Sequence, residues 1–205
     1  MIGGGIELLV ALARRGSAAT QEYAAWQLRR LAFKADHGVA IVRAGAIKPL
    51  VALVRSGSAG AQEDAAGALV YLAGGNADNQ ADITHAGAIE PLVALVRSGS
   101  AGAQEAAAGA LVFLAGGNAV NQAAITHAGA IEPLVALVRS GSAGAQETAA
   151  SALLVLADNA GYRLAIARAG AIEPLVALVR SGSTGAQGQA AWVLSRLTRD
   201  AARRE

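Results

Sequence analysis

The chain has 205 residues, of which 54% are apolar and only 3% aromatic, and its formal net charge is +2. A core built mainly from Ala, Leu, Val and Ile suits closely packed helices better than a sandwich or barrel, whose strands favour β-branched and aromatic residues. The absence of cysteine excludes disulfides, thiolate metal sites and cysteine nucleophiles. A small excess of arginine over carboxylates does not make a polycation, so nucleic acid is not an expected partner.

Neither a signal peptide nor a membrane span is expected. The N-terminal sequence lacks the basic start and the long apolar run of a signal peptide. The longest uncharged stretch runs from Ala106 to Ile131, but glycine and polar residues interrupt it. A spanning helix needs about 20 mostly apolar residues without such breaks. The compartment stays open, with the cytoplasm or nucleus expected if the protein is natural.

The first helices are predicted between residues 3 and 43. Ile6–Leu12 is a degenerate copy of a helical pattern that returns four times further along the chain. The long helix that follows carries Gln27, Arg29 and Arg30, whereas the equivalent helices of units two and three have valine and an aromatic residue in place of the two arginines. These residues predict a polar end of the molecule. A second polar end is predicted from Arg196, Arg199, Asp200, Arg203 and Arg204.

The next predicted helix carries apolar residues at i, i+3, i+4 and i+7, which form one helical face. Pro49 stands in its first turn, where the missing N–H costs nothing. Gly57 is predicted to stop the helix in a left-handed conformation. Ser58 is predicted to cap the helix after it. The apolar face consists of Ile47, Leu50, Val51 and Val54.

A longer helix then runs to about Ala73, where two glycines break it. Asn76 is predicted to cap a short third helix that ends near His85, and Gly87 is predicted to turn the chain into the next Pro-led helix. The residues of the longer helix that are predicted to face inward are Ala65, Ala66, Leu69 and Leu72.

These three elements recur in one register. The string AGAI, then Lys or Glu, then PLVALVRSG begins at four positions separated by 42, 42 and 41 residues: Ala44, Ala86, Ala128 and Ala169. One such unit cannot bury its own apolar faces, so neighbouring units must stack. Together with the degenerate first copy, the pattern predicts one domain over residues 1–205 with five units, near 3–43, 44–85, 86–127, 128–168 and 169–205.

This pattern resembles the armadillo repeat. The matching string is NxxNQxxIxxAGAIxPLVALVRSGSxGAQExAAxAL, which recurs over nearly the whole chain. The two-helix repeats known as HEAT are the nearest rival, but the short first helix and its Ala-Gly hinge favour armadillo. The resemblance implies an all-α fold, a right-handed α-α superhelix of about five three-helix repeats. It also implies that the long helices line a concave groove, which in the family binds extended peptides or protein surfaces.

The residues expected to line the groove depart from the family pattern. In armadillo proteins that bind extended peptides, the long helix often carries a Trp and, four residues later on the same face, an Asn. Here only the two terminal units have the Trp, and no unit has the Asn. The resemblance therefore predicts the fold but not this way of holding a peptide. The Trp positions are Trp26, Gly67, Gly109, Ser151 and Trp192, and the Asn positions are Arg30, Tyr71, Phe113, Val155 and Arg196.

These ten positions predict a partner-binding groove of another kind. Tyr71, Phe113 and Val155 would form an apolar strip, and the small residues beside it would leave room for a partner. A bounded apolar patch usually marks an interaction site. We expect the groove to bind a protein or peptide, either an apolar helix or an extended segment, or a second copy of the chain. In the alternative, this surface is unoptimised, or Tyr71 and Phe113 turn inward to fill space left by glycine.

The other recurring polar residues have structural explanations, and no catalytic site, metal or cofactor is expected. His85 and His127 end short helices, where a partly cationic ring meets the negative end of the helix dipole. Stacked helices lie about 8–10 Å apart, too far for one metal ion to bridge both rings. The same dipole explains the arginines that end the Pro-led helices, Arg55, Arg97, Arg139 and Arg180. Glutamates are predicted in the favourable first turn of the long helices, at Glu22, Glu63, Glu105 and Glu147.

Units two and three differ at only five of 42 positions. This near-identity fits a recent duplication or a consensus-like engineered armadillo repeat scaffold, and we favour the second. The leading functional hypothesis is a non-enzymatic protein-interaction scaffold with a concave groove. The alternative is a natural or engineered structural protein whose own stacking or oligomerisation is its purpose, with no biological ligand.

Overall fold

The computed structural model describes residues 2–199, which form fourteen α-helices and no β-strand. Asp200, Arg203 and Arg204 of the predicted polar end lie outside these described residues. Three kinds of helix alternate along the chain. The long helices are α2 (Ala18–Ala32), α5 (Ala59–Ala73), α8 (Ala101–Ala115), α11 (Ala143–Ala157) and α14 (Thr184–Arg199). The Pro-led helices are α4 (Ile47–Ser56), α7 (Ile89–Ser98), α10 (Ile131–Ser140) and α13 (Ile172–Ser181), with α1 (Ile2–Arg15) as their counterpart without proline. The short helices are α3 (Ala35–Arg43), α6 (Ala77–His85), α9 (Ala119–His127) and α12 (Ala160–Arg168).

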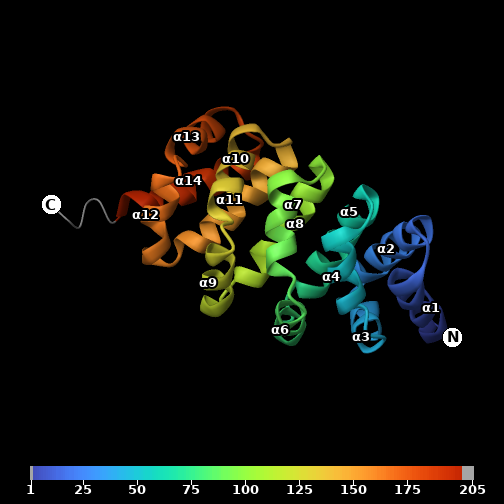
Figure 1. The fold of residues 1–205 in the computed structure, drawn as a ribbon. Helices are drawn as coiled ribbons and strands as arrows, with labels where there is room; N and C mark the ends of the chain where they lie inside the picture. Colours follow the sequence, from blue (N-terminus) through green and yellow to red (C-terminus); the bar gives the residue numbers. More distant parts are fainter. Residues whose placement is uncertain (1, 200–205) are drawn as a thin grey trace.

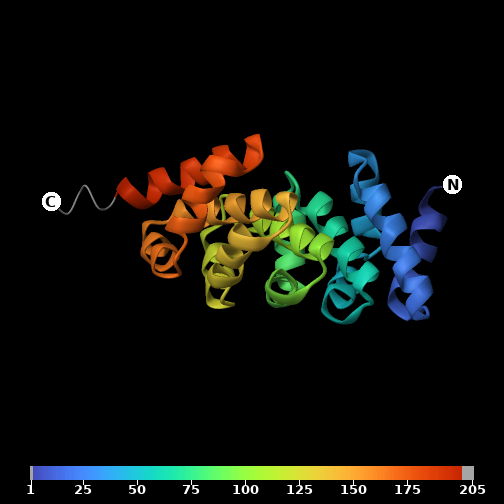
Figure 2. The ribbon, with the colours of Figure 1, turned by 90° about the horizontal axis from the view of Figure 1, so that it is seen from above.

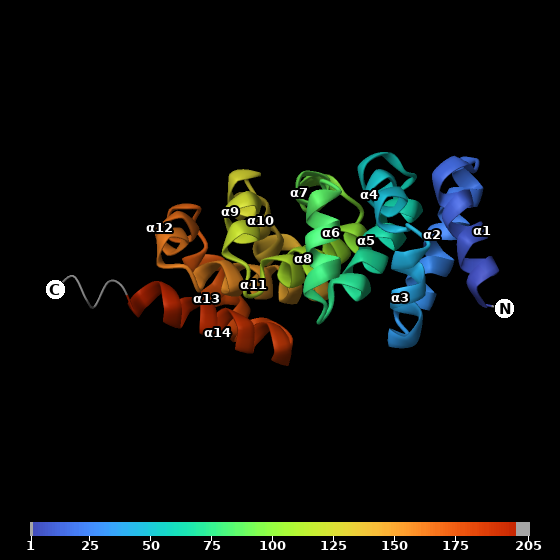
Figure 3. The ribbon, with the colours of Figure 1, turned by 90° about the horizontal axis from the view of Figure 1, so that it is seen from below.

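The helices stack one after another in a curved, elongated row, with α1 and α14 at opposite ends (Figure 1). Each long helix packs against the next, in the order α2, α5, α8, α11 and α14, and the Pro-led helices contact one another in the same way. Views from above and below show the same linear order (Figures 2 and 3). Each layer therefore buries its apolar surface against its neighbours, as expected for a solenoid.

The core consists of small and aliphatic side chains. The four residues of α5 that were predicted to face inward, Ala65, Ala66, Leu69 and Leu72, are all buried. The apolar face of α4 is buried as well, including Pro49 in its first turn. Alanine allows the long helices to approach closely, so the chain fills its core with few aromatic rings.

No single helix within residues 2–199 is long and apolar enough to cross a membrane. One pair of segments, Asp36–Arg43 and Ile47–Ser56, reaches the required length and composition together, but the two are bent by 84° to each other.

The predicted helix ends are confirmed at most positions. The Ser58 hydroxyl accepts a hydrogen bond from the Ala61 N–H at 3.2 Å, and so caps α5. The Asn76 side chain accepts one from the Asn79 N–H at 3.0 Å, and so caps α6. Gly87 has a φ of +76°, which L side chains rarely adopt, and it turns the chain into α7.

The predicted left-handed conformation of Gly57 is wrong. Its φ and ψ are −73° and 173°, which is extended backbone. Glycine is needed here for space, because a Cβ would lie only 2.7 Å from the carbonyl oxygen of Leu53 and 3.0 Å from the Cβ of Ala61. The chain leaves α4 in this direction so that the next residue, Ser58, can cap α5.

The predicted position of the repeated glutamates is also wrong, because none lies in the first turn of its own long helix. Each carboxylate instead reaches the first turn of the next long helix. The Ser58 hydroxyl, which caps α5, donates to the carboxylate of Glu22 on α2 at 2.5 Å. Ser183 donates in the same way to Glu147 at 2.8 Å. The favourable contact between a carboxylate and a helix N-terminus therefore exists, but it links two neighbouring units and does not lie within one unit.

Side-chain amides tie the three helices of a unit together. Gln104 donates to the carbonyl of Val96 at the end of α7, at 3.3 Å. Asn121 on α9 donates to the carbonyl of Leu114 at the end of α8, at 2.8 Å. Helix C-terminal carbonyls lack intrahelical partners, so these amides satisfy groups that would otherwise be buried unpaired.

Candidate functional site

The long helices present one continuous face along the row, which we call the long-helix face. On α5 this face contains Glu63, Gly67 and Tyr71, which are spaced by four residues and therefore lie in line. Equivalent lines are formed by Glu105, Gly109 and Phe113 on α8 and by Glu147, Ser151 and Val155 on α11. Each line runs from an acidic residue through a small residue to an apolar one.

The structure places the ten predicted groove residues as follows. Tyr71 and Phe113 are each 40% exposed, so neither ring turns into the core. Trp26 and Trp192, near the two ends of the row, are 42% and 61% exposed. Arg30 is exposed and Gly67 is buried. The remaining positions are partly buried: Gly109, Ser151, Val155 and Arg196.

The room expected beside Gly67 is already occupied. A Cβ at this position would lie 2.6 Å from Nε of Arg29, because the Arg29 side chain crosses from α2 onto α5. There its guanidinium pairs with Asp64 at 3.0 Å and approaches Glu63 at 3.8 Å. The sequence predicted that Arg29 belongs to a polar, solvated end of the molecule. In the structure its side chain instead joins the first two units. A small residue at Gly67 makes space for this arginine and not for a partner.

Gly109 has a more open setting than Gly67. Its equivalent of Arg29 is Val70, and a Cβ at Gly109 would meet only the Cγ2 of Val70, at 3.4 Å. At the other end of the row, Arg196 forms an ion pair with Asp158. Its guanidinium is thus held by a carboxylate near the end of α11.

The sequence reasoning missed an aromatic cluster at the α2 end. Phe33 is 70% exposed, and its ring meets Tyr71 edge to face, with centroids 5.4 Å apart and planes at 79°. The rings of Tyr23 and Trp26 lie 6.1 Å apart, and the guanidinium of Arg30 lies 4.7 Å from the centre of the Trp26 ring. A signal was present in the repeat itself, because Phe33 and Lys34 replace the two glycines that end α5.

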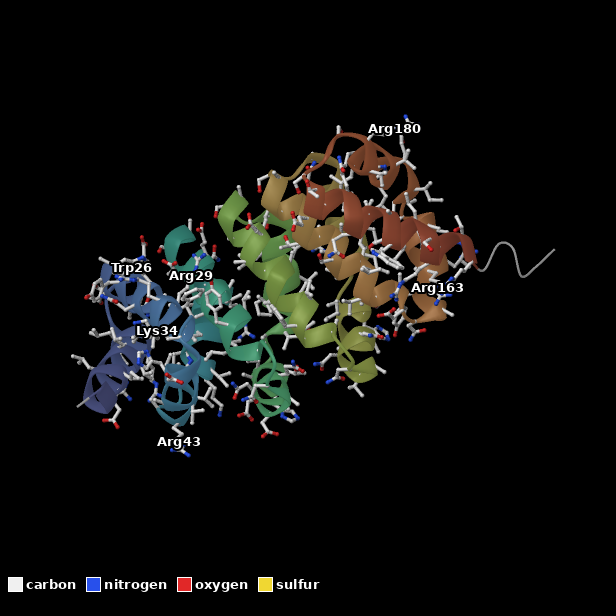
Figure 4. All side chains as sticks on the ribbon, turned by 180° about the vertical axis from the view of Figure 1, so that it is seen from behind. Trp26, Arg29, Lys34, Arg43, Arg163 and Arg180 are labelled. Atoms are coloured by element: carbon white, nitrogen blue, oxygen red, sulfur yellow. The ribbon has the colours of Figure 1, made fainter. Side chains whose placement is uncertain are left out.

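Two depressions open on the long-helix face. The α2–α5 pocket has a volume of about 630 Å³ and is lined by Trp26, Arg29, Arg30, Phe33, Lys34, Glu63, Asp64 and Tyr71. Figure 4 shows three of these side chains, Trp26, Arg29 and Lys34, at the α2 end of the row. The smaller α5–α8 pocket, of about 260 Å³, shares Arg29, Glu63 and Tyr71 with it and extends to Gly109.

The other recurring polar residues lie apart from this face. His85 and His127 end α6 and α9 and are exposed, and within residues 2–199 no group of three or more His, Asp or Glu could hold a metal ion. In the first three of the four Pro-led helices, the arginine of the last turn reaches toward the next unit. A Cβ at Gly87 would lie 3.8 Å from Nη2 of Arg55, for example.

A comparison with known families decides the identity of the repeats. The sequence model of the armadillo/beta-catenin-like repeat matches residues 39–74, 76–113, 118–158 and 159–199. The chain belongs to the armadillo repeat family. The all-α fold predicted from the sequence, a right-handed superhelix of about five armadillo repeats, is therefore confirmed. No curated protein matches this armadillo chain significantly.

Several solved structures share this armadillo fold, and they are engineered proteins. One, an engineered protein from the Northeast Structural Genomics Consortium, is 34% identical with a TM-score of 0.85, over 93% of this chain and 80% of that one. A designed armadillo repeat protein in complex with the peptide (KR)4 is 28% identical with a TM-score of 0.83, over 95% and 82%. A computationally designed armadillo repeat protein for modular peptide recognition is 27% identical with a TM-score of 0.86, over 94% and 82%.

Proposed function

We propose that this armadillo protein is a non-enzymatic scaffold that binds a peptide or protein segment along its long-helix face. The observation that carries this proposal is the row of exposed apolar side chains on that face, above all Tyr71 and Phe113. Both rings stand outside the core, and Tyr71 lines two depressions that a side chain could enter. The designed armadillo proteins of the same fold, described as serving peptide recognition, support the same function.

The mode of binding differs from one based on asparagine side chains. The five positions where the family pattern would place an asparagine hold Arg30, Tyr71, Phe113, Val155 and Arg196. Three of these side chains are apolar or aromatic, so the central part of the face offers apolar contact and few amide hydrogen bonds. We therefore infer that the partner presents apolar side chains, from either an extended segment or a helix.

Replacement of Phe113 by Glu tests the proposal. Phe113 is 40% exposed, so the charge can be accommodated without entering the core. Val120→Glu is the matched control, because Val120 is 77% exposed on α9 and unit two carries Asp78 at the same place. Peptides selected from a random library displayed on phage against the wild-type protein are then measured against both variants. We expect Phe113→Glu to weaken their binding about tenfold or more, as for a central apolar anchor, and Val120→Glu to leave it unchanged.

Self-association is the competing function, since Ile172 and Trp192 near the α14 end are 51% and 61% exposed. Light scattering separates the two. A monomer whose selected peptides depend on Phe113 supports the binding scaffold. A defined oligomer that selects no peptide favours the structural alternative, and a folded Phe113→Glu variant with unchanged peptide binding and unchanged mass contradicts both uses of this face.

A further inference from the structure

We propose that the α2–α5 pocket is an anchoring subsite for a peptide segment in which an acidic residue neighbours an aromatic or large apolar residue. The inference rests on the proposed peptide-binding function and specifies which chemistry one end of the face selects. It comes from the combination of exposed rings and unpaired cations in one depression, which no other part of the described face repeats.

The apolar part of the subsite is formed by Phe33 and Tyr71. Their edge-to-face contact holds the two rings at 79° to each other, which makes a corner on the pocket wall. Phe33 is 70% exposed, so burial of its ring contributes little to the stability of the free protein. A pocket of about 630 Å³ has room for a large side chain of a partner. An apolar side chain in this corner would cover surface that is otherwise in contact with water.

The charged part of the subsite is formed by two of its three cations. Arg29 is paired with Asp64 and lies near Glu63, so its charge is already compensated. No ion pair joins Arg30 or Lys34 to a carboxylate within residues 2–199. These two cations line the same pocket as the aromatic corner. An incoming carboxylate would therefore complete the charge balance there.

Arg30 is already oriented for this role. Its guanidinium lies 4.7 Å from the centre of the Trp26 ring, and the side chain is exposed. A guanidinium that lies against an aromatic ring keeps N–H groups free to bind a carboxylate, often through two parallel hydrogen bonds. Binding therefore requires less ordering of this long side chain than a freely moving arginine would need.

The same geometry favours a peptide over a nucleic acid. Glu63 and Asp64 line the pocket itself, and Glu105 lines the adjoining α5–α8 pocket. A phosphate backbone that continued along the face would meet these carboxylates, and its affinity depends on how many phosphates are neutralised. A single acidic residue can reach Arg30 and Lys34 without this repulsion. The peptide charge preferred here is therefore opposite to that of the basic peptide (KR)4, with which a designed armadillo repeat protein of the same fold forms a complex.

Matched peptides test the subsite on the complete protein. The probe is the peptide Gly-Ser-Glu-Phe-Glu-Gly-Ser, with three variants that replace both Glu by Lys, both Glu by Gln, or Phe by Ala. Each is titrated to about 1 mM, which detects weak binding, while the indole N–H of Trp26 is followed by NMR. We expect the Glu-Phe-Glu peptide to bind about tenfold more tightly than the Lys-Phe-Lys peptide at low salt, and this preference to shrink as salt is added.

Charge reversal in the protein completes the test. The double variant Arg30→Glu with Lys34→Glu should reverse the order of the two charged peptides, and Phe33→Ala should weaken both. Lys48→Glu is the matched control, since units three to five carry glutamate at this position on the Pro-led helices. It should leave the order unchanged.

The outcomes separate this inference from the function on which it rests. The subsite is contradicted if peptides bind through Phe113 but show no preference for acidic residues. It is also contradicted if the double variant keeps the same preference as the wild type. In both cases the scaffold function remains supported. An oligothymidylate that binds more tightly than the Glu-Phe-Glu peptide also overturns it. If neither the library nor any matched peptide binds, both proposals fail.

Discussion

The hydroxyl of Ser100 donates a hydrogen bond to the carboxylate of Glu63, 3.4 Å away, and thereby joins the cap of α8 to the side of α5. The same carboxylate lies over the first turn of α8, where a Cβ on Gly102 would overlap it. Negative charge is favourable at a helix N-terminus. Each repeat therefore places an acidic residue where the next repeat has the positive end of its longest helix.

The residue types at these two positions depend on whether the contact is present. Long helices that receive a carboxylate have glycine as their second residue, at Gly60, Gly102, Gly144 and Gly185. The first long helix receives none and has Ala19 there. The last long helix has Gly188 where the others have the glutamate. Glycine and glutamate thus occur as partners in neighbouring units, which explains why a residue with low helix propensity recurs inside a helix.

The first prediction concerns this partnership. Glu63→Ala should destabilise the protein by about 0.3–1 kcal/mol, because the N-terminus of α8 loses its charge. Gly102→Ala should be close to neutral alone, since its helix propensity gain offsets the displaced carboxylate, but should stabilise by about 0.5–1 kcal/mol in the Glu63→Ala background. Denaturant unfolding of the four proteins gives the coupling directly. Additive effects would mean that the two residues act independently.

Gly99 provides the second prediction. Gly99→Ala should cost about 1–3 kcal/mol through crowding, because the new methyl group would lie 2.7 Å from the backbone oxygen of Leu95. Gly109→Ala is the control, because its Cβ would meet only Val70 at an ordinary 3.4 Å. That substitution should stabilise by about 0.5–1 kcal/mol from helix propensity. Thermal and denaturant unfolding measure both, and a stable Gly99→Ala variant would show that the turn can relax.

The Arg29–Asp64 pair provides the third prediction. Asp64→Ala should cost at most about 1 kcal/mol, because unit three has alanine at the same place. Arg29→Val should cost more, about 1–3 kcal/mol, since the side chain of Asp64 is only 16% exposed and would lose its partner. The double variant, which has the residue pair found between units two and three, Val70 and Ala106, should recover most of this loss. Unfolding midpoints of all three variants check the order, and a double variant less stable than either single one would contradict it.

The fourth prediction concerns how damage spreads along the row. Leu111 on α8 is 1% exposed, so Leu111→Ala should destabilise the protein by about 2–5 kcal/mol. Because each layer contacts only its neighbours, hydrogen exchange should accelerate most in α8 and in the adjoining α5 and α11. Exchange in α1 should change least. Uniform acceleration over all helices would indicate that the array unfolds as a single unit.

The sequence alone determined the elements within each repeat. The period of about 42 residues, the serine and asparagine caps and the inward alanines of α5 were all predicted correctly. They follow from short-range patterns, because capping, turn formation and helix amphipathicity depend on residues within a few positions of one another. The armadillo fold followed from the recurrence of these patterns.

Only the tertiary structure decided what lies between repeats. The partner of Glu63, the crossing of Arg29 onto Asp64 and the meeting of Phe33 with Tyr71 each join residues about 35–40 positions apart. Such contacts depend on how far one layer is rotated and shifted against the next, and that geometry is set by the packing of whole helix faces. No pattern inside one repeat contains it, so the chemistry of the long-helix face became visible only when the repeats were stacked.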